Sequence, residues 1–151
     1  MVRQIAASVI SLMALLGCSV PADNSGGALY GAAGNISVLD IVDGDTIRIA
    51  GSTPGEIVSA RLTGYDTPEV SDPGCPEELA LGNAATQRLQ TILHDAVRID
   101  TQLQGIDRYQ RVLLRLTVDG RDLADIMISE GLAVRYTGGQ RVNWCNRLAA
   151  T

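Results

Sequence analysis

Four short groups of charged residues follow one another between residues 43 and 111. They are Asp-Gly-Asp-Thr at 43–46, Arg61, Asp-Thr-Pro-Glu at 66–69, and Asp-Arg-Tyr-Gln-Arg at 107–111. Each group alone is common in proteins. Together they supply carboxylates to hold a hard divalent cation, a further carboxylate to activate water, and two guanidinium groups to bind a phosphate. This combination indicates a metal-dependent phosphodiesterase.

Two aspartates, Asp45 and Asp66, are the expected cation ligands. Calcium takes several oxygen ligands at roughly 2.3–2.6 Å in an adaptable geometry, so two carboxylates leave room for water and substrate. Asp43 lies across the same turn from Asp45. An aspartate before glycine often serves the turn itself, and the sequence leaves open whether Asp43 shapes the turn or supports the site.

Glu69 is the expected general base. It follows Pro68, whose fixed φ also restricts Thr67, so this segment has a defined path. A carboxylate held in this way can orient and deprotonate a water molecule for in-line attack on phosphorus, a contribution commonly of about 10²–10⁴-fold. The alternative for Glu69 is a solvated loop carboxylate.

Two arginines, Arg61 and Arg111, are the expected phosphate ligands. Arg61 ends a strand pattern that puts its side chain on one face with Ser59 and Ile57. Arg111 opens a later strand after a loop. Two guanidinium groups at one phosphoryl group would offset the charge that develops on its oxygens in the transition state. Three other strand arginines are expected on solvated faces: Arg48, Arg98 and Arg115.

Three strands are expected to carry the first of these residues. Residues 36–42 and 46–50 are short β-branched runs that flank Asp43-Gly44, a strong hairpin signal. A third strand is expected from Glu56 to Thr63, after the turn residues 51–55. The three strands should form a meander.

Two helices and two more strands are expected after the meander. Apolar residues recur at helical spacing over 76–96, with a proline suited to the first turn. Strands are expected over 97–103 and 109–118. A second helix should run from a cap at Asp122 to Glu130, followed by a glycine stop signal.

The expected order is therefore β-β-β-α-β-β-α. Five short strands with a helix between the third and the fourth are the layout of an OB-type barrel. The sequence predicts a mainly β protein of the α+β class, built as a five-stranded OB-fold barrel with two to three helices.

The first 18 residues have the pattern of a secretion signal. Arg3 gives a positive start, and residues 5–16 are uncharged and mostly apolar, a stretch too short to span a bilayer comfortably. The Leu-Leu-Gly-Cys sequence ending at Cys18 resembles a bacterial lipobox, in which the cysteine becomes lipidated. An ordinary cleaved signal is the alternative. Residues 19–34 are rich in glycine and small residues and are expected to be a flexible linker, with the folded domain over 35–151.

Export would leave two cysteines, Cys75 and Cys145, in an oxidising compartment. A disulfide between them is the simplest expectation. It would close a loop of about 70 residues and contribute on the order of 4 kcal/mol by the chain-entropy model. A zinc site is the competing interpretation, but it needs more ligands than two distant cysteines and the lone His94 provide.

The overall charge is acidic, with 12 basic against 17 acidic residues. The chain therefore lacks the general basic surface of many nucleic-acid-binding proteins. All of its basic residues except the one histidine are arginines. Any phosphate contact must therefore be made by guanidinium groups, whose planar fork engages two oxygens at once.

The ordered motifs resemble those of the staphylococcal nuclease (thermonuclease) family. The resemblance covers about residues 36–136 and includes a Glu-Gly-Leu-Ala sequence at 130–133. It implies an OB-fold barrel, a bound calcium ion (Ca2+), and hydrolysis of phosphodiester bonds in DNA or RNA. By position, the resemblance implies these roles: Asp45, Asp66 and the Thr67 carbonyl as metal ligands, Glu69 as the catalytic carboxylate, and Arg61 and Arg111 as the phosphate-binding arginines.

The same resemblance assigns two tyrosines to a nucleotide pocket, Tyr109 and Tyr136. Stacking of an aromatic ring on a base contributes about 1–3 kcal/mol. Tyr65 is expected to pack in the interior. The chain departs from the family after Tyr136, where too few residues remain for a long terminal helix. Trp144 and Cys145 are expected to pin this segment through packing and the disulfide.

Three functions remain in view. The first is an exported, monomeric calcium-dependent nuclease acting on DNA or RNA, located in the periplasm, on the membrane through a lipidated Cys18, or outside the cell. The second is a catalytically inactive OB-fold module that binds nucleic acid or protein on the cell envelope. The third is a structural envelope lipoprotein. A pure binding module has no need for all five of the charged residues Asp45, Asp66, Glu69, Arg61 and Arg111, so the sequence favours the nuclease.

Overall fold

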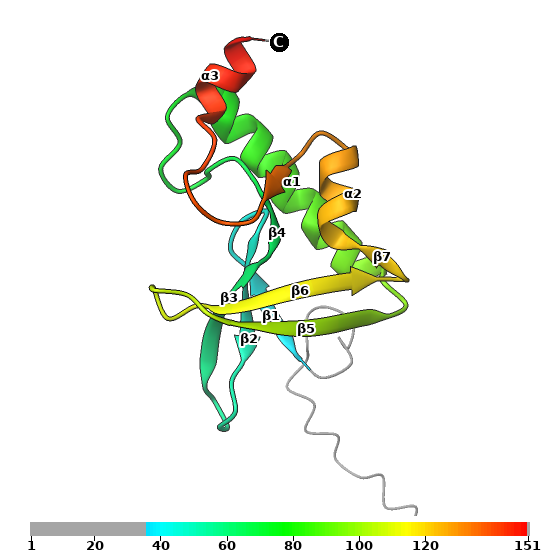
Figure 1. Cartoon of the computed structure of the whole chain (residues 1–151). Helices are drawn as coiled ribbons and strands as arrows, with labels where there is room; N and C mark the ends of the chain where they lie inside the picture. The colour runs from blue at the N-terminus through cyan, green and yellow to red at the C-terminus, as the bar shows by residue number, and fades with distance from the viewer. Residues whose placement is uncertain (1–35, 151) are drawn as a thin grey trace, which may run out of the picture.

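The computed structural model describes residues 36–150, and its chain begins with three antiparallel strands (Figure 1). These are β1 (Val38–Ile41), β2 (Thr46–Ala50) and β3 (Ile57–Leu62). β1 pairs with β2, and β2 pairs with β3 in an unbroken register from Thr46↔Arg61 to Ala50↔Ile57. The expected meander is confirmed. The predicted signal segment with Cys18 and the linker lie outside the described residues.

A second hairpin completes the larger sheet. β5 (Ile99–Ile106) pairs antiparallel with β6 (Val112–Val118), and β6 pairs in parallel with β3. The sheet order is β1-β2-β3-β6-β5, with the short β7 (Arg121–Asp122) beside β6. Figure 1 shows the long β5–β6 hairpin crossing the meander. The molecule is thus an α+β protein with a mixed sheet, and closure of the sheet into a barrel stays a prediction.

A small second sheet was not predicted from the sequence. It consists of β4 (Gly64–Asp66) and β8 (Val134–Tyr136), which pair antiparallel with Asp66 opposite Val134. Gly64 has φ 95°, a conformation that glycine adopts without strain, and it turns the chain out of β3 directly into β4. The pairing brings the chain after residue 134 beside the Asp66 segment.

The described residues contain three helices. α1 (Pro76–Asp95) begins with proline in its first turn and buries an apolar stripe, as predicted. α2 (Leu123–Ser129) is capped by the Asp122 side chain, which accepts a hydrogen bond from the Ala124 amide, again as predicted. α3 (Trp144–Ala149) is a short helix that the sequence did not predict as an element. It lies beside the start of α1 in Figure 1.

One hydrophobic core lies between the larger sheet and the helices α1 and α2. Side chains of the sheet, α1 and α2 form one buried cluster that includes Ile47, Leu62, Leu89, Leu93 and Met127. Burial of each large aliphatic side chain contributes about 1.5–3 kcal/mol relative to an exposed position. Within residues 36–150, no helix has both the length and the apolar character needed to cross a bilayer.

Candidate active site

The turn between β1 and β2 is packed tightly against the rest of the site. Asp43 accepts a hydrogen bond from the Asp45 amide (3.0 Å), so Asp43 shapes the turn, and burial raises its pKa although Thr46 and Arg61 oppose the change. A Cβ on Gly44 would lie 2.8 Å from both the Ala85 Cβ and the Thr67 Cγ2. Only glycine at position 44 therefore allows α1 and the 66–69 segment to lie so close to this turn.

Asp45 and Thr67 join two motifs that are 22 residues apart. Both are buried, at 4% and 1% exposure. The Thr67 amide and hydroxyl each donate a hydrogen bond of 3.0 Å to Asp45 Oδ2. The Thr46 hydroxyl donates to the other carboxylate oxygen at 3.1 Å. These bonds fix the Asp45 carboxylate against the start of the 67–69 segment.

Arg61 lies between the two aspartates. Its guanidinium forms ion pairs with Asp45 and Asp66 and donates to the Tyr65 carbonyl (3.2 Å). The residue is only 8% exposed. Burial lowers the pKa of the guanidinium, while Asp66 opposes this change. The side chain thus points inward, as the strand pattern predicted, and it remains charged because arginine titrates far above neutral pH.

Asp66 is completely buried and is surrounded by donors. Its Oδ1 accepts from the Arg61 guanidinium at 3.1 Å and from Arg141 Nε at 2.6 Å, and its Oδ2 accepts from Trp144 Nε1 at 3.2 Å. A buried carboxylate is stable only when it is paired and hydrogen-bonded. The three donors meet that requirement.

Arg141 is the site residue that the sequence analysis missed. Besides Asp66, its guanidinium contacts the Thr67 carbonyl at 3.0 Å and forms an ion pair with Glu69. Burial would lower its pKa, but Asp66 and Glu69 together raise the pKa above the ordinary arginine value. No motif or periodicity marks Arg141. The only clue in the sequence is its place between a glycine pair and the single tryptophan.

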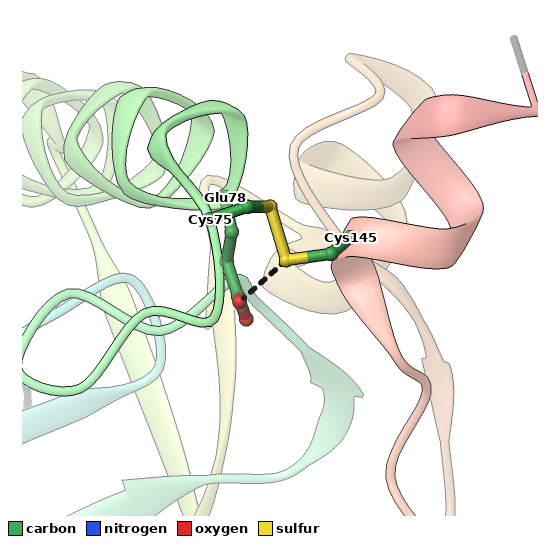
Figure 2. A group of neighbouring side chains, drawn as sticks. All are labelled: Cys75, Glu78 and Cys145. Carbon is green, nitrogen blue, oxygen red and sulfur yellow. Dashed lines mark hydrogen bonds between the residues drawn. A yellow bond between two sulfur atoms is a disulfide. The ribbon is translucent and has the colours of Figure 1, made fainter.

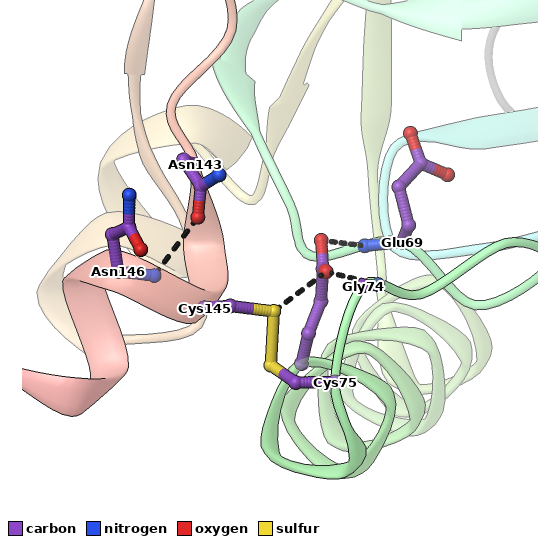
Figure 3. Close-up of a disulfide and its surroundings, with 7 residues drawn as sticks. Glu69, Gly74, Cys75, Asn143, Cys145 and Asn146 are labelled. Carbon is purple, nitrogen blue, oxygen red and sulfur yellow. Dashed lines mark hydrogen bonds between the residues drawn. A yellow bond between two sulfur atoms is a disulfide. The ribbon is translucent and has the colours of Figure 1, made fainter.

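Glu69 is held through its main chain. Its amide donates to the Glu78 side chain at 3.2 Å, and the other Glu78 oxygen accepts from the Gly74 amide at 2.8 Å. Dashed lines at the labelled Glu69 and Gly74 mark these two bonds in Figure 3. Glu78, on the first turn of α1, is buried. A Cβ on Gly82 would lie 2.9 Å from the Pro68 carbonyl oxygen. Helix α1 therefore packs against the backbone of the 68–70 segment, while the Glu69 side chain stays 36% exposed.

A disulfide joins Cys75 and Cys145, the pair that the sequence predicted (Figure 2). It ties α3 to the start of α1, and the Cys145 sulfur lies 3.4 Å from Glu78 Oε2. Among the described residues, Cys75, Glu78 and Cys145 are the one group of three His, Cys, Asp or Glu side chains whose ligand atoms all lie within 4.8 Å of one another. Because both sulfurs are bonded to each other, they are not available as thiolates.

The oxygen donors of the site suit a hard cation. Asp45, Asp66, the Thr67 carbonyl and Glu69 present only oxygen atoms, which calcium prefers. Three of these groups already converge on one positive centre, since the Arg141 guanidinium contacts Asp66, the Thr67 carbonyl and Glu69. The residues present therefore fit a bound calcium ion in their chemistry.

A cavity of about 620 Å³ opens next to this cluster. Arg61, Tyr109, Arg111 and Tyr136 all line it, whereas Asp45, Asp66 and Glu69 do not. The predicted phosphate and nucleotide residues thus share one cavity, and Arg61 connects it to the carboxylates. Arg115, expected on a solvated face, lines the cavity as well and pairs with an aspartate of β7. With Arg108, four arginines and one aspartate line the cavity, and three of these arginines are paired with aspartates of the described residues.

The turn before β6 positions two of the lining residues. Asp107 accepts hydrogen bonds from the amides of Tyr109 (2.8 Å) and Arg111 (2.9 Å) and from Arg111 Nε (2.7 Å). Burial would raise the pKa of Asp107, but its bonds with Arg111 hold the pKa below the usual value. The Tyr109 ring lies under the guanidinium groups of Arg108 and Arg111, at 4.8 and 5.6 Å.

The other two tyrosines of residues 36–150 have different environments. Tyr65 is fully buried and donates to the Gly44 carbonyl at 2.9 Å, and burial raises its pKa well above 10. The expectation that Tyr65 packs in the interior is confirmed. Tyr136, on β8, donates to the Gly139 carbonyl at 2.8 Å and so closes the loop that leads to Arg141.

Comparison with known proteins agrees with these motifs. The family model described as staphylococcal nuclease homologue matches residues 59–147. A thermonuclease of Staphylococcus hyicus is 29% identical over 96 residues, 64% of this chain and 56% of the relative. A probable endonuclease of Verticillium alfalfae is 31% identical over 94 residues, 60% of this chain and 32% of the relative. The chain thus spans about half the length of the first and a third of the second.

Proposed function

Because the chain belongs to the staphylococcal nuclease family, we propose that it is a calcium-dependent nuclease that hydrolyses phosphodiester bonds in DNA or RNA. One observation carries the proposal. Asp45, Asp66, the Thr67 carbonyl and Glu69 gather in one network, and Arg61 links that network to a cavity lined by Arg111.

Arg61 and Arg111 would bind the scissile phosphate. Both line the same cavity, from β3 and from the start of β6. Each guanidinium already holds a carboxylate, Asp66 for Arg61 and Asp107 for Arg111. A phosphate entering the cavity offers oxygens of the same charge and geometry, so exchange of partners needs no new type of contact. Two such groups would stabilise charge on the phosphoryl oxygens in the transition state.

Glu69 would act as the general base. Its backbone is fixed by Glu78, while its side chain is the most accessible of the three site carboxylates. Bound calcium would supply positive charge that offsets the negative charge of the phosphate oxygens. Glu69 would then orient a water molecule and accept its proton as the oxygen attacks phosphorus.

Tyr109 and Tyr136 would contact the nucleotide. Both line the cavity, and the Tyr109 ring is largely exposed while arginines flank it. An exposed aromatic face next to guanidinium groups suits a base and its phosphate.

A binding module without catalysis is the second candidate. The observation in its favour is that Arg141 pairs with Glu69, which leaves the expected base already engaged. One measurement separates the two candidates, because only a nuclease would cleave the bound nucleic acid into shorter fragments.

The direct test is incubation of the purified protein with single-stranded DNA and with RNA, in calcium and then in chelator. We expect cleavage in calcium and none in chelator, with magnesium supporting less because its octahedral shell adapts less well. Undiminished cleavage in chelator would remove the metal from the mechanism. Tight binding without cleavage of either substrate would favour the module.

We also propose that the protein is exported as a monomer and anchored through a lipidated Cys18, and that its sheet closes into an OB-type barrel. The Cys75–Cys145 disulfide supports export, because such bonds persist in oxidising compartments. Mass spectrometry of the membrane-bound protein would test the anchor. A Cys18→Ser variant that stays in the membrane fraction would argue against it.

A further inference from the structure

We infer that Arg141 is an internal competitor of calcium and so sets the affinity of the site for metal. Its guanidinium occupies the oxygens of Asp66, Thr67 and Glu69, and it must leave them before a cation can bind there. The inference rests on the proposed calcium dependence. It adds a residue that belongs to none of the proposed catalytic, metal or substrate positions.

The geometry is that of an occupied cation site. Each nitrogen of the Arg141 guanidinium has its own acceptor: Nε contacts Asp66 Oδ1, Nη1 contacts Glu69, and Nη2 contacts the Thr67 carbonyl. Two of the three acceptors are residues proposed to ligate calcium. The guanidinium and a calcium ion cannot use the same oxygens in the same way at the same time.

Departure of Arg141 would not leave Asp66 without partners. Arg61 and Trp144 also donate to the Asp66 carboxylate, at 3.1 and 3.2 Å. The Arg141 side chain is 41% exposed, whereas Asp66 is completely buried. The partly exposed guanidinium can move outward into water while the buried carboxylate stays in place to receive the cation. The free energy of the contacts that Arg141 gives up is then subtracted from the binding of the cation.

The backbone around Arg141 permits this exchange without release of α3. Gly138 and Gly139, with φ values of 107° and 94°, lie just before Arg141, and glycine restricts the backbone less than any other residue, so a shift of Arg141 would meet little local resistance there. On the other side, the disulfide fixes Cys145 to α1. The guanidinium thus stays close to the site after it leaves, at a high effective concentration, and it competes with calcium continuously.

Trp144 provides a readout that is independent of nuclease activity. It is the single tryptophan of the chain, and its indole N–H donates to Asp66 Oδ2. Tryptophan fluorescence therefore reports on the immediate surroundings of Asp66. Calcium binding can be followed by this signal and by calorimetry in the absence of any substrate.

The test compares calcium affinities of the wild-type protein, Arg141→Gln and Arg135→Gln. Arg135 is an exposed arginine of β8 that pairs with Asp125, so its variant controls for the loss of one positive charge. We expect Arg141→Gln to bind calcium about tenfold more tightly or better, and Arg135→Gln to stay within about twofold of the wild type. Arg141→Lys, which keeps the charge but lacks the planar fork, should fall between.

Melting temperatures give a second, independent comparison. In chelator, Arg141→Gln should melt below the wild type because Asp66 and Glu69 lose a partner. Saturating calcium should shrink that deficit, since the cation replaces the missing charge. A residue with only a structural role would leave the deficit unchanged by calcium.

The outcomes separate this inference from the proposed function. Calcium affinity that is equal or weaker in Arg141→Gln would overturn the competition and leave the calcium-dependent nuclease standing. Absence of calcium binding to every variant, with nuclease activity retained in chelator, would overturn the calcium dependence and the competition with it.

Discussion

Arg61 and Arg111 have the same proposed role but different surroundings. The Arg61 side chain is 9% exposed and bridges two buried aspartates, whereas Arg111 is 31% exposed and holds Asp107 at the edge of the cavity. Removing one partner of a buried ion pair leaves an uncompensated charge, which costs about 3–5 kcal/mol, while an exposed pair contributes less than about 1 kcal/mol.

The first prediction follows from this contrast. Arg111→Ala should lower turnover by about two orders of magnitude with only a small change in melting temperature, because it acts on the transition state. Arg61→Ala should lower both turnover and stability. Nuclease assays and thermal melts check this. Arg48→Ala, at an exposed ion pair, is the control. A fully active Arg111→Ala protein would exclude Arg111 from phosphate binding.

The second prediction is that Glu69→Gln lowers turnover while the domain stays folded. The substitution keeps the shape of the side chain, and Glu78 holds the backbone of the segment, so the fold should be preserved. Turnover should fall about 10²-fold or more if Glu69 is the base. Single-turnover cleavage rates measure the effect, with Glu77→Gln on the exposed side of α1 as the control. Near-normal cleavage would instead favour the binding module.

The site residues in the four charged groups could be predicted from the sequence, because each group is a short local motif whose residue types suggest a chemical role. The structure brings Asp45, Arg61, Asp66 and Glu69 together, and puts Arg111 across the cavity. Arg141 could not be found in this way. It reaches Asp66 across 75 residues of sequence, and only the β4–β8 pairing and the disulfide bring it there.

At the scale of elements, helix α1 determines where Glu69 lies. Gly82 faces the carbonyl oxygens of Pro68 and Glu69, at 2.9 and 3.0 Å from the place that a Cβ would take. These contacts are shorter than normal van der Waals distances. An added methyl group must therefore push the helix and the 68–70 segment apart.

The third prediction is that Gly82→Ala lowers activity about tenfold or more although Gly82 touches no substrate. A misplacement near 1 Å at a catalytic group can cost about 10²-fold. Alanine favours the helix by about 1 kcal/mol, which offsets part of the strain, so the melting temperature should change less than the rate. Asn83→Ala, at the exposed neighbouring position, should leave the rate unchanged. An unaltered rate in Gly82→Ala would show that α1 does not position Glu69.

The longer elements were predictable, whereas the shortest strands and helix α3 were not. α1 and the β5–β6 hairpin extend over enough residues for their periodicity to show. The three-residue strands β4 and β8 carry no such pattern, because their pairing depends on where the ends of β3 and α2 place them. Short helix α3 depends in turn on Asn143, whose side chain caps it, and on the disulfide.

At the scale of the whole molecule, the acidic net charge contrasts with the arginines that line the cavity. The chain carries a formal charge of −5, yet the cavity is lined by four arginines and a single aspartate. Long-range attraction to a polyanion should therefore be weak, and favourable contacts should arise mainly inside the cavity. This arrangement suits recognition of a short stretch of phosphate backbone.

The fourth prediction concerns the disulfide. A Cys75→Ser/Cys145→Ser protein should lose on the order of 4 kcal/mol of stability by the chain-entropy model, because the bond closes a long loop. Its activity at 25 °C should fall much less, since neither cysteine lies in the proposed catalytic set. Thermal melts and nuclease assays test both parts. Detection of two free thiols in the wild-type protein, by mass spectrometry without reductant, would contradict the bond itself.

The same bond has a topological consequence for the polypeptide. Residues 75–145 form a covalent ring, and Arg111, Tyr136 and Arg141 lie within it, while Asp45 and Glu69 precede it. A protease that cuts once at the exposed Tyr109 turn would open the ring without releasing a fragment. Both halves of the cavity would stay on one molecule. A protein nicked once in this way stays one covalent molecule, and two cuts within the ring are needed to remove a piece of it.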